Sequence, residues 1–496
     1  MTGPVHVAFD LGAESGRAMV GRFDGSRIEL AEARRFPTRS ARLPDGLYWD
    51  TVGLFSELTS ALAEVHASGA HIRSVGVDSW GVDFGLIDAN GSLVANPLSH
   101  RDGRGAAFVA EALNRVPAED VYGTTGIQLL PFNTLFQLLA LDAASALSRA
   151  ATLLLIPDLL AYWLTGERRV EETNASTTQL LDARTGDWAE ELIEKFGLPR
   201  RIFPSIVIAG SIVGGLLPHV AEATGLPRST PVTAVASHDT ASAVVAVPAA
   251  SAKNTAYISS GTWSLVGIEL DEPVLSTRAR AANLTNERGF GGTTRLLKNV
   301  MGLWLVQEVR RAWLRDGEAP SYADLGVLAE GSPGGVLFDP DLPELLTPGD
   351  MPARIRAACA RGGQSEPGDR PALLRAVFES LACKYRFVLD EIESVTGRTI
   401  ETVHVIGGGS QNAFLCQLTA NISRRAVFAG PVEAAAMGNV LVQLYAFGDV
   451  ASLTEMRQIV RSSTHLSSYE PDSATERWNE LYGRFRAVID TEVLTG

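Results

Sequence analysis

The feature that most constrains the fold is a short pattern that occurs twice, about 250 residues apart. Residues 5–23 contain an apolar stretch, a turn of small and polar residues from Asp10 to Gly16, and a second apolar stretch, which is the order of a β-hairpin. Residues 256–268 repeat this order around a turn at 259–262. A hairpin that opens each half of the chain predicts two halves built on one plan.

A second pair of segments repeats in the same way. The apolar stretch 72–77 leads into a polar turn that begins at Asp78, and the apolar stretch 402–406 leads into Gly407 to Gly409. Each stretch follows a helical pattern. The clearer helix begins near Pro371, places apolar residues at steps of three and four, and has Gly397 just past its end, where a left-handed residue is favoured.

These repeats predict an α/β fold with two related domains, at residues 1–246 and 253–496. The border lies in the small-residue segment 247–252. Ligands of such sheets bind at the ends of the strands and, in two-lobed proteins, in the cleft between the lobes. We therefore expect both hairpin turns to face one cleft.

The composition of the chain limits the kinds of partner that it can bind. The chain has 496 residues, and its 43 basic and 57 acidic side chains give a net charge of −14, which disfavours binding to nucleic acid or to an anionic membrane. Only three cysteines are present, too few for a disulfide framework. No secretory signal is evident, and the best apolar run, 151–164, is interrupted by Pro157. We expect a cytoplasmic protein.

The common catalytic signatures are absent: the chain has no phosphate-binding loop of the G-x-x-x-x-G-K-[ST] type, no G-x-G-x-x-G after a strand, no H-E-x-x-H and no G-x-S-x-G. The first turn still offers backbone N–H groups and Arg17 for phosphate, with Asp10 for a hydrated Mg²⁺. The alternative is an ordinary hairpin turn. The second turn has hydroxyls and a glycine but no charge.

Two further features carry candidate chemistry. Asp239 lies between apolar flanks, where a carboxylate is costly unless it has a partner or a task. It is either a general base for a hydroxyl nucleophile or, with Ser237, a candidate helix cap. The three glycines 407–409 permit an adenine or ribose to lie on the backbone, or else form a tight turn from strand to helix.

These segments resemble a known superfamily. Residues 10–17, 260–262 and 407–409 are similar to the phosphate-1, phosphate-2 and adenosine segments of the actin, hexokinase and heat-shock ATPase superfamily. Within it the chain resembles the FGGY carbohydrate kinases over essentially its whole length. The stretches that carry this resemblance are 78–84, 126–134, 236–243, 259–265 and 297–307.

The resemblance implies two ribonuclease-H-like domains with a ligand cleft between them, the first with the phosphate-1 loop and most sugar contacts, the second with the phosphate-2 loop and the adenosine site. It also implies a magnesium-dependent sugar kinase with ATP as phosphoryl donor. The stretches are most similar to members that phosphorylate L-rhamnulose at its 1-hydroxyl in rhamnose catabolism. Another ketose, such as L-fuculose or xylulose, and a non-catalytic ATP-binding regulator are the alternatives.

The same resemblance implies roles for single residues. Asp239 matches the proton acceptor, and Asp10 is the candidate for Mg²⁺ through water. The positions that match sugar contacts are Gly81, His238, Asp239, Thr240 and Asn299. Those that match ATP contacts are Ala13, Glu14, Ser15, Gly16, Arg17, Thr262, Gln307 and Gly408.

One position departs from the family pattern. The family often has serine where this chain has Glu14. A carboxylate that pointed at bound phosphates would repel them unless Mg²⁺ or Arg17 compensated for its charge. Because a turn that cradles phosphate presents its N–H groups inward, we expect the Glu14 side chain to point away.

Overall fold

The computed structural model describes residues 3–251 and 253–495, which form two compact units. The first unit comprises the chain up to Ala250, Glu269–Leu296 and Ala434–Ser463, and the second comprises Ser251–Ile268, Leu297–Glu433 and the chain from Thr464 on. The chain first leaves the first unit inside the segment 247–252, and two later segments return to it. The division into residues 1–246 and 253–496 stays a prediction.

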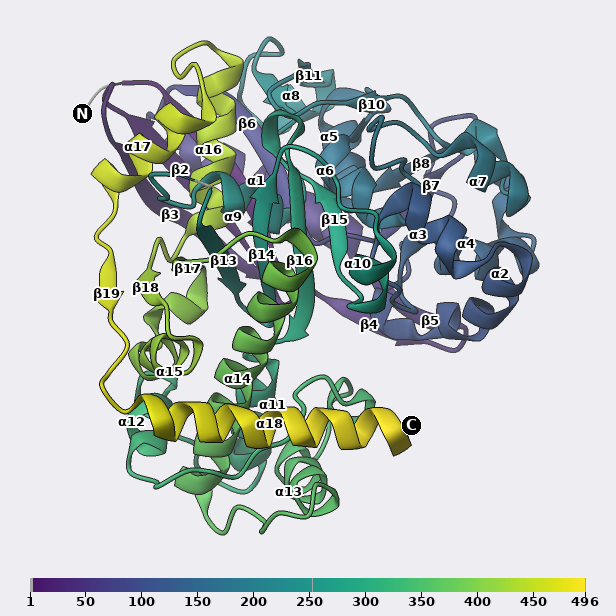
Figure 1. The fold of residues 1–496 in the computed structure, drawn as a ribbon. Coiled ribbons are helices and arrows are strands. Elements are labelled where there is room, and N and C mark those ends of the chain that lie inside the picture. The colour runs from purple at the N-terminus through teal and green to yellow at the C-terminus, as the bar shows by residue number, and fades with distance from the viewer. Residues whose placement is uncertain (1–2, 252, 496) are drawn as a thin grey trace. The chain divides into compact units, whose positions relative to one another are not determined.

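The first unit is built on a six-stranded sheet with the order β11-β12-β6-β1-β2-β3 (Figure 1). Its strands are β1 (Val5–Leu11), β2 (Ser15–Phe23), β3 (Ile28–Pro37), β6 (Ile72–Ser79), β11 (Ile212–Gly215) and β12 (Pro231–Thr233). Shorter strands are β4 (Ser40–Leu43), β5 (Gly46–Trp49), β7 (Phe84–Ile87), β8 (Thr152–Leu155), β9 (Val170–Glu171), β10 (Ile206–Val207) and β15 (Thr285–Arg288).

Two helices of the first unit, α16 and α17, lie in the late segment 434–463. The helices are α1 (Thr51–Ala67), α2 (Val109–Arg115), α3 (Ala118–Thr125), α4 (Thr134–Ala143), α5 (Ile156–Thr165), α6 (Glu172–Ala175), α7 (Glu190–Lys195), α8 (Pro218–Thr224), α9 (Asp239–Val245), α10 (Thr277–Ala281), α16 (Ala434–Ala446) and α17 (Leu453–Ser463). Helix α16 packs on β1, on β6 and along α9. Apolar side chains of β1, β6, α1 and α5 form the core beneath the sheet.

The second unit holds most of a sheet with the strand order β15-β16-β14-β13-β17-β18-β19 (Figure 1). Strands β14 and β16 cross the boundary between the units. The strands not yet given are β13 (Thr255–Ser260), β14 (Trp263–Leu270), β16 (Thr294–Met301), β17 (Thr402–Ile406), β18 (Ala426–Ala429) and β19 (Ser467–Tyr469). The helices are α11 (Trp304–Arg315), α12 (Tyr322–Glu330), α13 (Met351–Arg361), α14 (Arg370–Thr396), α15 (Ala413–Ser423) and α18 (Thr475–Thr495).

The two sheets share one topology. Strand β1 pairs antiparallel with β2 and parallel with β6, and β13 likewise pairs antiparallel with β14 and parallel with β17. Beyond them, β6 and β12 are parallel and β11 is antiparallel, as are β17, β18 and β19 in the same order. The prediction of an α/β fold with two related halves is confirmed.

The helix expected after Pro371 is confirmed as α14. Asp369 caps it by accepting a hydrogen bond from the backbone N–H of Ala372, and Pro371 lies in its first turn, where the missing N–H is not needed. Gly397 ends the helix in the left-handed region, with φ at 69°. No helix in the described ranges is long and apolar enough to cross a membrane.

Candidate active site

The first hairpin turn joins two charged residues. The residues Asp10 and Arg17 are partners in the register of β1 and β2, and the Arg17 guanidinium donates to Asp10 Oδ2 at 2.5 Å. The strands run further into this segment than the sequence predicts, so the turn itself is Gly12 to Glu14. A side chain at Gly16 would place Cβ 2.4 Å from the Phe36 ring, so only glycine fits.

Asp78 joins this cluster, although the sequence analysis did not assign it a role. It is the parallel partner of Asp10 at the end of β6 and is fully buried. Asn439 of α16 donates to its Oδ2 at 2.6 Å. Burial, and then the negative charge of Asp10, raises the pKa of Asp78 well above its usual range. An Asp at the end of a neighbouring parallel strand was the signal that could have identified it.

Asp239 opens α9, and its environment distinguishes it from its neighbours. His238 is the N-cap residue, but its side chain makes no capping hydrogen bond, so neither Asp239 nor Ser237 is the cap residue. The Asp239 side chain is 29% exposed, whereas Ser237, His238 and Thr240 are buried. Asp239 Oδ1 accepts from the backbone N–H of Thr240 at 2.6 Å. The Asp239 charge contributes to raising the pKa of Asp78, so these carboxylates interact electrostatically.

The loop after β6 carries Gly81 and holds its neighbour Val82 at a φ of 65°, a conformation that β-branched residues rarely adopt. Thr177 Oγ1 accepts from the Val82 N–H, and Thr134 donates to the Val82 carbonyl oxygen. A Cβ on Gly81 would lie 2.9 Å from Thr177. Strain held in place by such contacts is typical of binding sites.

His238 is held by two charged residues that the sequence analysis missed. Its Nδ1 lies 3.2 Å from Glu287 Oε2 and 3.1 Å from a nitrogen of Arg295. Glu287 and Arg295 also pair with each other at 3.0 Å, and Arg295 is fully buried. No clear signal in the sequence pointed to Arg295, because β16 also carries Lys298 and Asn299. Only its burial in the fold shows that its charge needs a partner.

The second hairpin turn is neutral and is packed tightly against glycines. It consists of Gly261 and Thr262, between β13 and β14. A Cβ on Gly302 would lie 2.6 Å from the Trp263 backbone, and one on Gly409 would lie 2.0 Å from Ser260 Oγ. The turn therefore meets both the start of α11 and the glycine segment after β17.

The other expected nucleotide contacts lie around this turn. The Trp304 N–H, at the start of α11, donates to the Thr262 carbonyl oxygen. Gln307 follows one turn later, and its Oε1 is buried without a hydrogen-bond partner among the described residues. Gly408 is exposed, and a Cβ added there would meet no atom within 4 Å. The glycine segment is a turn from strand to helix, and Gly408 leaves its surface open.

The structure thus groups the expected residues into two sets. The first unit contains Asp10, Ala13, Glu14, Ser15, Gly16, Arg17, Gly81, His238, Asp239 and Thr240, and the second contains Thr262, Asn299, Gln307 and Gly408. Asn299 lies on β16. It belongs to the second unit, whereas the other expected sugar contacts come earlier in the sequence and belong to the first unit. The roles of all these residues stay predictions.

Comparison with known proteins identifies the family. The profile of the "FGGY family of carbohydrate kinases, N-terminal domain" matches residues 5–246, and that of the C-terminal domain matches residues 256–447. A rhamnulokinase of Bacteroides thetaiotaomicron is 42% identical over 97% of this chain and 99% of its own. A rhamnulokinase of Enterococcus faecalis is 40% identical over 97% of both chains.

Solved structures agree on the fold. A ligand-bound xylulose kinase from Lactobacillus acidophilus superposes with a TM-score of 0.82 at 16% identity, over 98% of both chains. A glycerol kinase from Plasmodium falciparum with ADP gives a TM-score of 0.79 at 17% identity, also over 98% of both chains. With both domain profiles matched and relatives similar over almost the whole length, this chain belongs to the FGGY family of carbohydrate kinases.

Proposed function

We propose that this chain transfers the γ-phosphoryl group of ATP to the 1-hydroxyl of L-rhamnulose, giving L-rhamnulose 1-phosphate and ADP. The sugar is inferred from the curated rhamnulokinases, which are 38–42% identical over nearly the full chain. The observation that carries the chemistry is the environment of Asp239, a partly exposed carboxylate between buried neighbours at the start of α9.

Asp239 acts as the general base in this proposal. Its carboxylate accepts the proton of the 1-hydroxyl while that oxygen bonds to the γ-phosphorus, and the bond from the γ-phosphorus to the β–γ bridging oxygen breaks. Because the Asp239 side chain is partly exposed, a hydroxyl can reach it. Gly81, His238, Thr240 and Asn299 are the proposed sugar contacts, and the Glu287–Arg295 pair fixes the His238 ring.

The nucleotide binds, we propose, to the two hairpin turns and the glycine segment. Residues 13–17 and Thr262 contact the phosphates, while Gln307 and Gly408 contact the adenosine. The buried, unpartnered Oε1 of Gln307 and the open surface at Gly408 suit this role.

The residues present also fit Mg²⁺, which prefers carboxylate oxygens and retained water. Asp10 and Asp78 are each the second-to-last residue of the neighbouring strands β1 and β6, and Asp78 Oδ1 is buried without a hydrogen-bond partner within the described ranges. Asp10, through water, and Asp78 would hold the ion. When bound, Mg²⁺ would neutralise charge on the phosphates of ATP.

The cellular setting follows from the substrates and the charge. We propose that the enzyme works in the cytoplasm, where ATP is available, and that its partners are small molecules. Its three cysteines are buried free thiols, the usual state in a reducing compartment. The net charge of −14 disfavours nucleic acid as a partner.

A ketose panel tests the proposed function. ATP consumption is coupled to a dye and measured with L-rhamnulose, L-fuculose and D-xylulose, with Asp239→Asn protein as the control, and phosphorus NMR locates the phosphate in the product. We expect the highest kcat/KM with L-rhamnulose and phosphate on carbon 1. A tenfold higher kcat/KM with another ketose would show that this ketose, and not L-rhamnulose, is the substrate. Nucleotide binding without turnover of any ketose would indicate a regulator.

A further inference from the structure

One carboxylate holds the segment that leads into Asp239. Glu171, at the end of β9, accepts five hydrogen bonds on its Oε2. Two come from the backbone N–H and hydroxyl of Ser237, two from those of Thr173, and one from the backbone N–H of Asn174. Ser237 is two residues before Asp239, so this one oxygen atom helps to fix the position of the proposed base.

Other contacts also hold the same segment, among them the Glu287–Arg295 pair at the His238 ring and the Ser242 hydroxyl, which donates to the Ala236 carbonyl oxygen. Ser79 donates its backbone N–H to the Ser237 carbonyl oxygen at 2.9 Å. The His238 N–H reaches Thr173 Oγ1 at 3.3 Å, and the Asn174 side chain reaches the Ser237 carbonyl oxygen at 3.4 Å. Thr173 and Asn174 are themselves held by Glu171. Glu171 thus organises both sides of the contact between α6 and the segment before α9.

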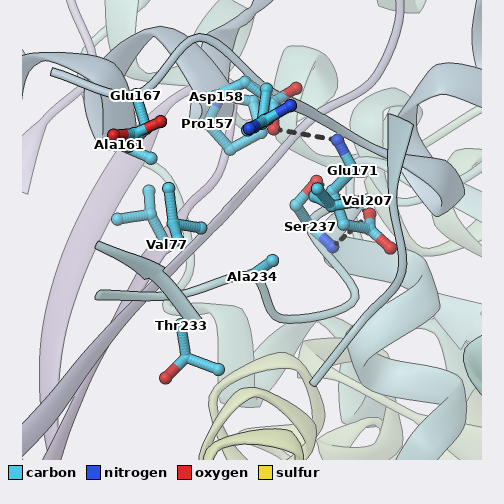
Figure 2. Close-up of a pocket in the computed structure, with 12 residues that line it drawn as sticks. Val77, Pro157, Asp158, Ala161, Glu167, Glu171, Val207, Thr233, Ala234 and Ser237 are labelled. Carbon is cyan, nitrogen blue, oxygen red and sulfur yellow. Dashed lines mark hydrogen bonds between the residues drawn. The ribbon is translucent and has the colours of Figure 1, made fainter. Parts of the chain in front are cut away.

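A second buried carboxyl lies beside Glu171. Asp158 of α5 accepts the Glu171 N–H at 3.1 Å, and both side chains line a small cavity of about 20 Å³, with room for about one water molecule. Figure 2 shows Asp158 beside the Glu171 backbone and the Glu171 carboxylate beside Ser237. Asp158 Oδ2 and Glu171 Oε1 have no hydrogen-bond partner among the described residues.

Two buried carboxylates this close do not both ionise readily. Glu171 receives five hydrogen bonds, which favour its charged form, whereas one is found for Asp158. Burial, and then the charge of Glu171, raises the pKa of Asp158 well above its usual range. The proton therefore belongs on Asp158, and the negative charge on Glu171.

We propose that Glu171 is a positioning residue for phosphoryl transfer: its ionised carboxylate, beside a protonated Asp158, holds the Ser237 segment so that Asp239 meets the sugar hydroxyl. This inference rests on the proposed function of Asp239. No covalent step is assigned to Glu171 or to Asp158. A misplacement of about 1 Å at a reacting group can cost about a hundredfold in rate. Loss of the charge on Glu171 therefore slows the reaction by letting Asp239 move away from its position beside the sugar hydroxyl.

The arrangement makes the positioning sensitive to pH. Burial, and then the charge of Glu172, raises the pKa of Glu171 to about 7. Glu172 is itself paired with Arg288 at 3.4 Å. Of the other charged residues near this site, Glu167 and Arg169 line the cavity with Asp158. Below pH 7 Glu171 gains a proton and becomes a weaker acceptor, so the Ser237 segment is held less firmly.

Three variants separate this proposal from a general structural role. Glu171→Gln keeps the shape and removes the charge, Glu171→Asp keeps the charge on a shorter side chain, and Asp158→Asn is the matched control next to it. Each is assayed for kcat and for the KM of ATP and sugar from pH 5.5 to 8.5, with thermal melts. Hydrogen exchange of the peptide 234–242 is followed over the same range.

We expect wild-type kcat to fall below about pH 7 to an acid plateau. Glu171→Gln should give a kcat about tenfold lower that equals this plateau and changes little with pH, with the KM of ATP within twofold. Glu171→Asp should restore a pH-dependent rate. Asp158→Asn should keep wild-type kcat and profile, because Asp158 is already neutral. The protection factor of 234–242, which is the exchange rate of an unprotected amide at the same pH divided by the measured rate, should fall in acid in the wild type and be low at every pH in Glu171→Gln.

Three results would overturn the inference: wild-type kcat and profile in Glu171→Gln, loss of the acid decline in Asp158→Asn, or a wild-type protection factor of 234–242 that is the same at every pH. If Glu171→Gln does not fold, the wild-type exchange profile and the Asp158→Asn profile still decide the matter. Failure of the proposed function gives a different pattern. In that case Asp239→Asn stays active while exchange of 234–242 still follows the charge on Glu171.

Discussion

The two sheets place different chemistry at equivalent positions. In the first unit the hairpin carries Asp10 and Arg17, joined at 2.5 Å, and the parallel strand beside it ends in Asp78. In the second unit the hairpin turn is Gly261 and Thr262, and Gly407 directly follows the corresponding parallel strand. One topology therefore gives a charged strand end in the first unit and a neutral, glycine-lined one in the second.

The difference shows that one topology can present two kinds of side-chain chemistry at equivalent positions. Parallel strands that flank a hairpin bring their ends to one edge of the sheet, and this is fixed by the backbone in both units. The side chains at this edge then determine which chemistry each unit can support. Carboxylates and a guanidinium suit metal, phosphate and proton transfer, whereas an open glycine surface suits the flat, neutral part of a nucleotide.

The largest effect is expected at the charged end. Asp239→Asn keeps the shape and hydrogen bonding of the side chain but removes the proton acceptor, so kcat should fall by about 10²–10⁴-fold. Sugar affinity, measured by calorimetry, should stay within a few-fold. Retention of most activity would show that the comparison assigns the base wrongly.

A smaller effect is expected at the neutral end. Gly408→Ala adds a methyl group where no atom lies within 4 Å, so folding should be unaffected while the adenosine loses room. Overpacking costs about 1–3 kcal/mol, and we expect the KM of ATP to rise about tenfold, which is ~1.4 kcal/mol. Gly368→Ala, which also meets no atom, is the control. Equal ATP affinity in both variants would contradict an adenosine site at Gly408.

Asp78 allows a test by pH. Folding raises its pKa above 3.8, so the folded state binds the proton more tightly, and this carboxyl lowers stability as pH rises from 3.8 toward the folded pKa. Every tenfold gain in proton affinity on folding corresponds to about 1.4 kcal/mol. Without Mg²⁺, Asp78→Asn should melt higher than wild type at pH 7 but not at pH 3.5, and it should need a few-fold more Mg²⁺ for activity. Equal melting at pH 7 would refute the raised pKa.

The smallest effect is expected at Glu14. Its carbonyl oxygen accepts the Thr38 N–H, which ties the backbone of the turn to the end of β3. If the side chain points away from the phosphates, Glu14→Ser should change the KM of ATP by less than about threefold, or ~0.7 kcal/mol. Tenfold tighter ATP binding in Glu14→Ser would show that the Glu14 carboxylate points at the phosphates.

The fold was predictable because the pattern that defines it is local. Apolar strands around small-residue turns at Asp10 and Ser260 appear directly in the sequence, as does the period of α14. The strand lengths were not: Asp10 and Ser260 lie within strands rather than in the turns. Pairing with the neighbouring strand extended them, and single-chain propensity does not contain that contribution.

The residues that hold the candidate site residues in place were not predictable in the same way. Glu171, Glu287 and Arg295 act through partners that are far away in sequence, such as Ser237 and His238. Each is a charged residue that the fold buries, and only the fold shows which partner compensates for the burial.

The most direct test of the division between the units is to measure binding and turnover in the same two variants. ADP and L-rhamnulose affinities are determined by calorimetry for Asp239→Asn and Gly408→Ala, together with kcat. The account predicts that Asp239→Asn loses turnover but binds ADP like the wild type, while Gly408→Ala binds ADP about tenfold more weakly, or ~1.4 kcal/mol, and keeps its sugar affinity. A loss of ADP affinity in Asp239→Asn as large as that in Gly408→Ala would contradict it.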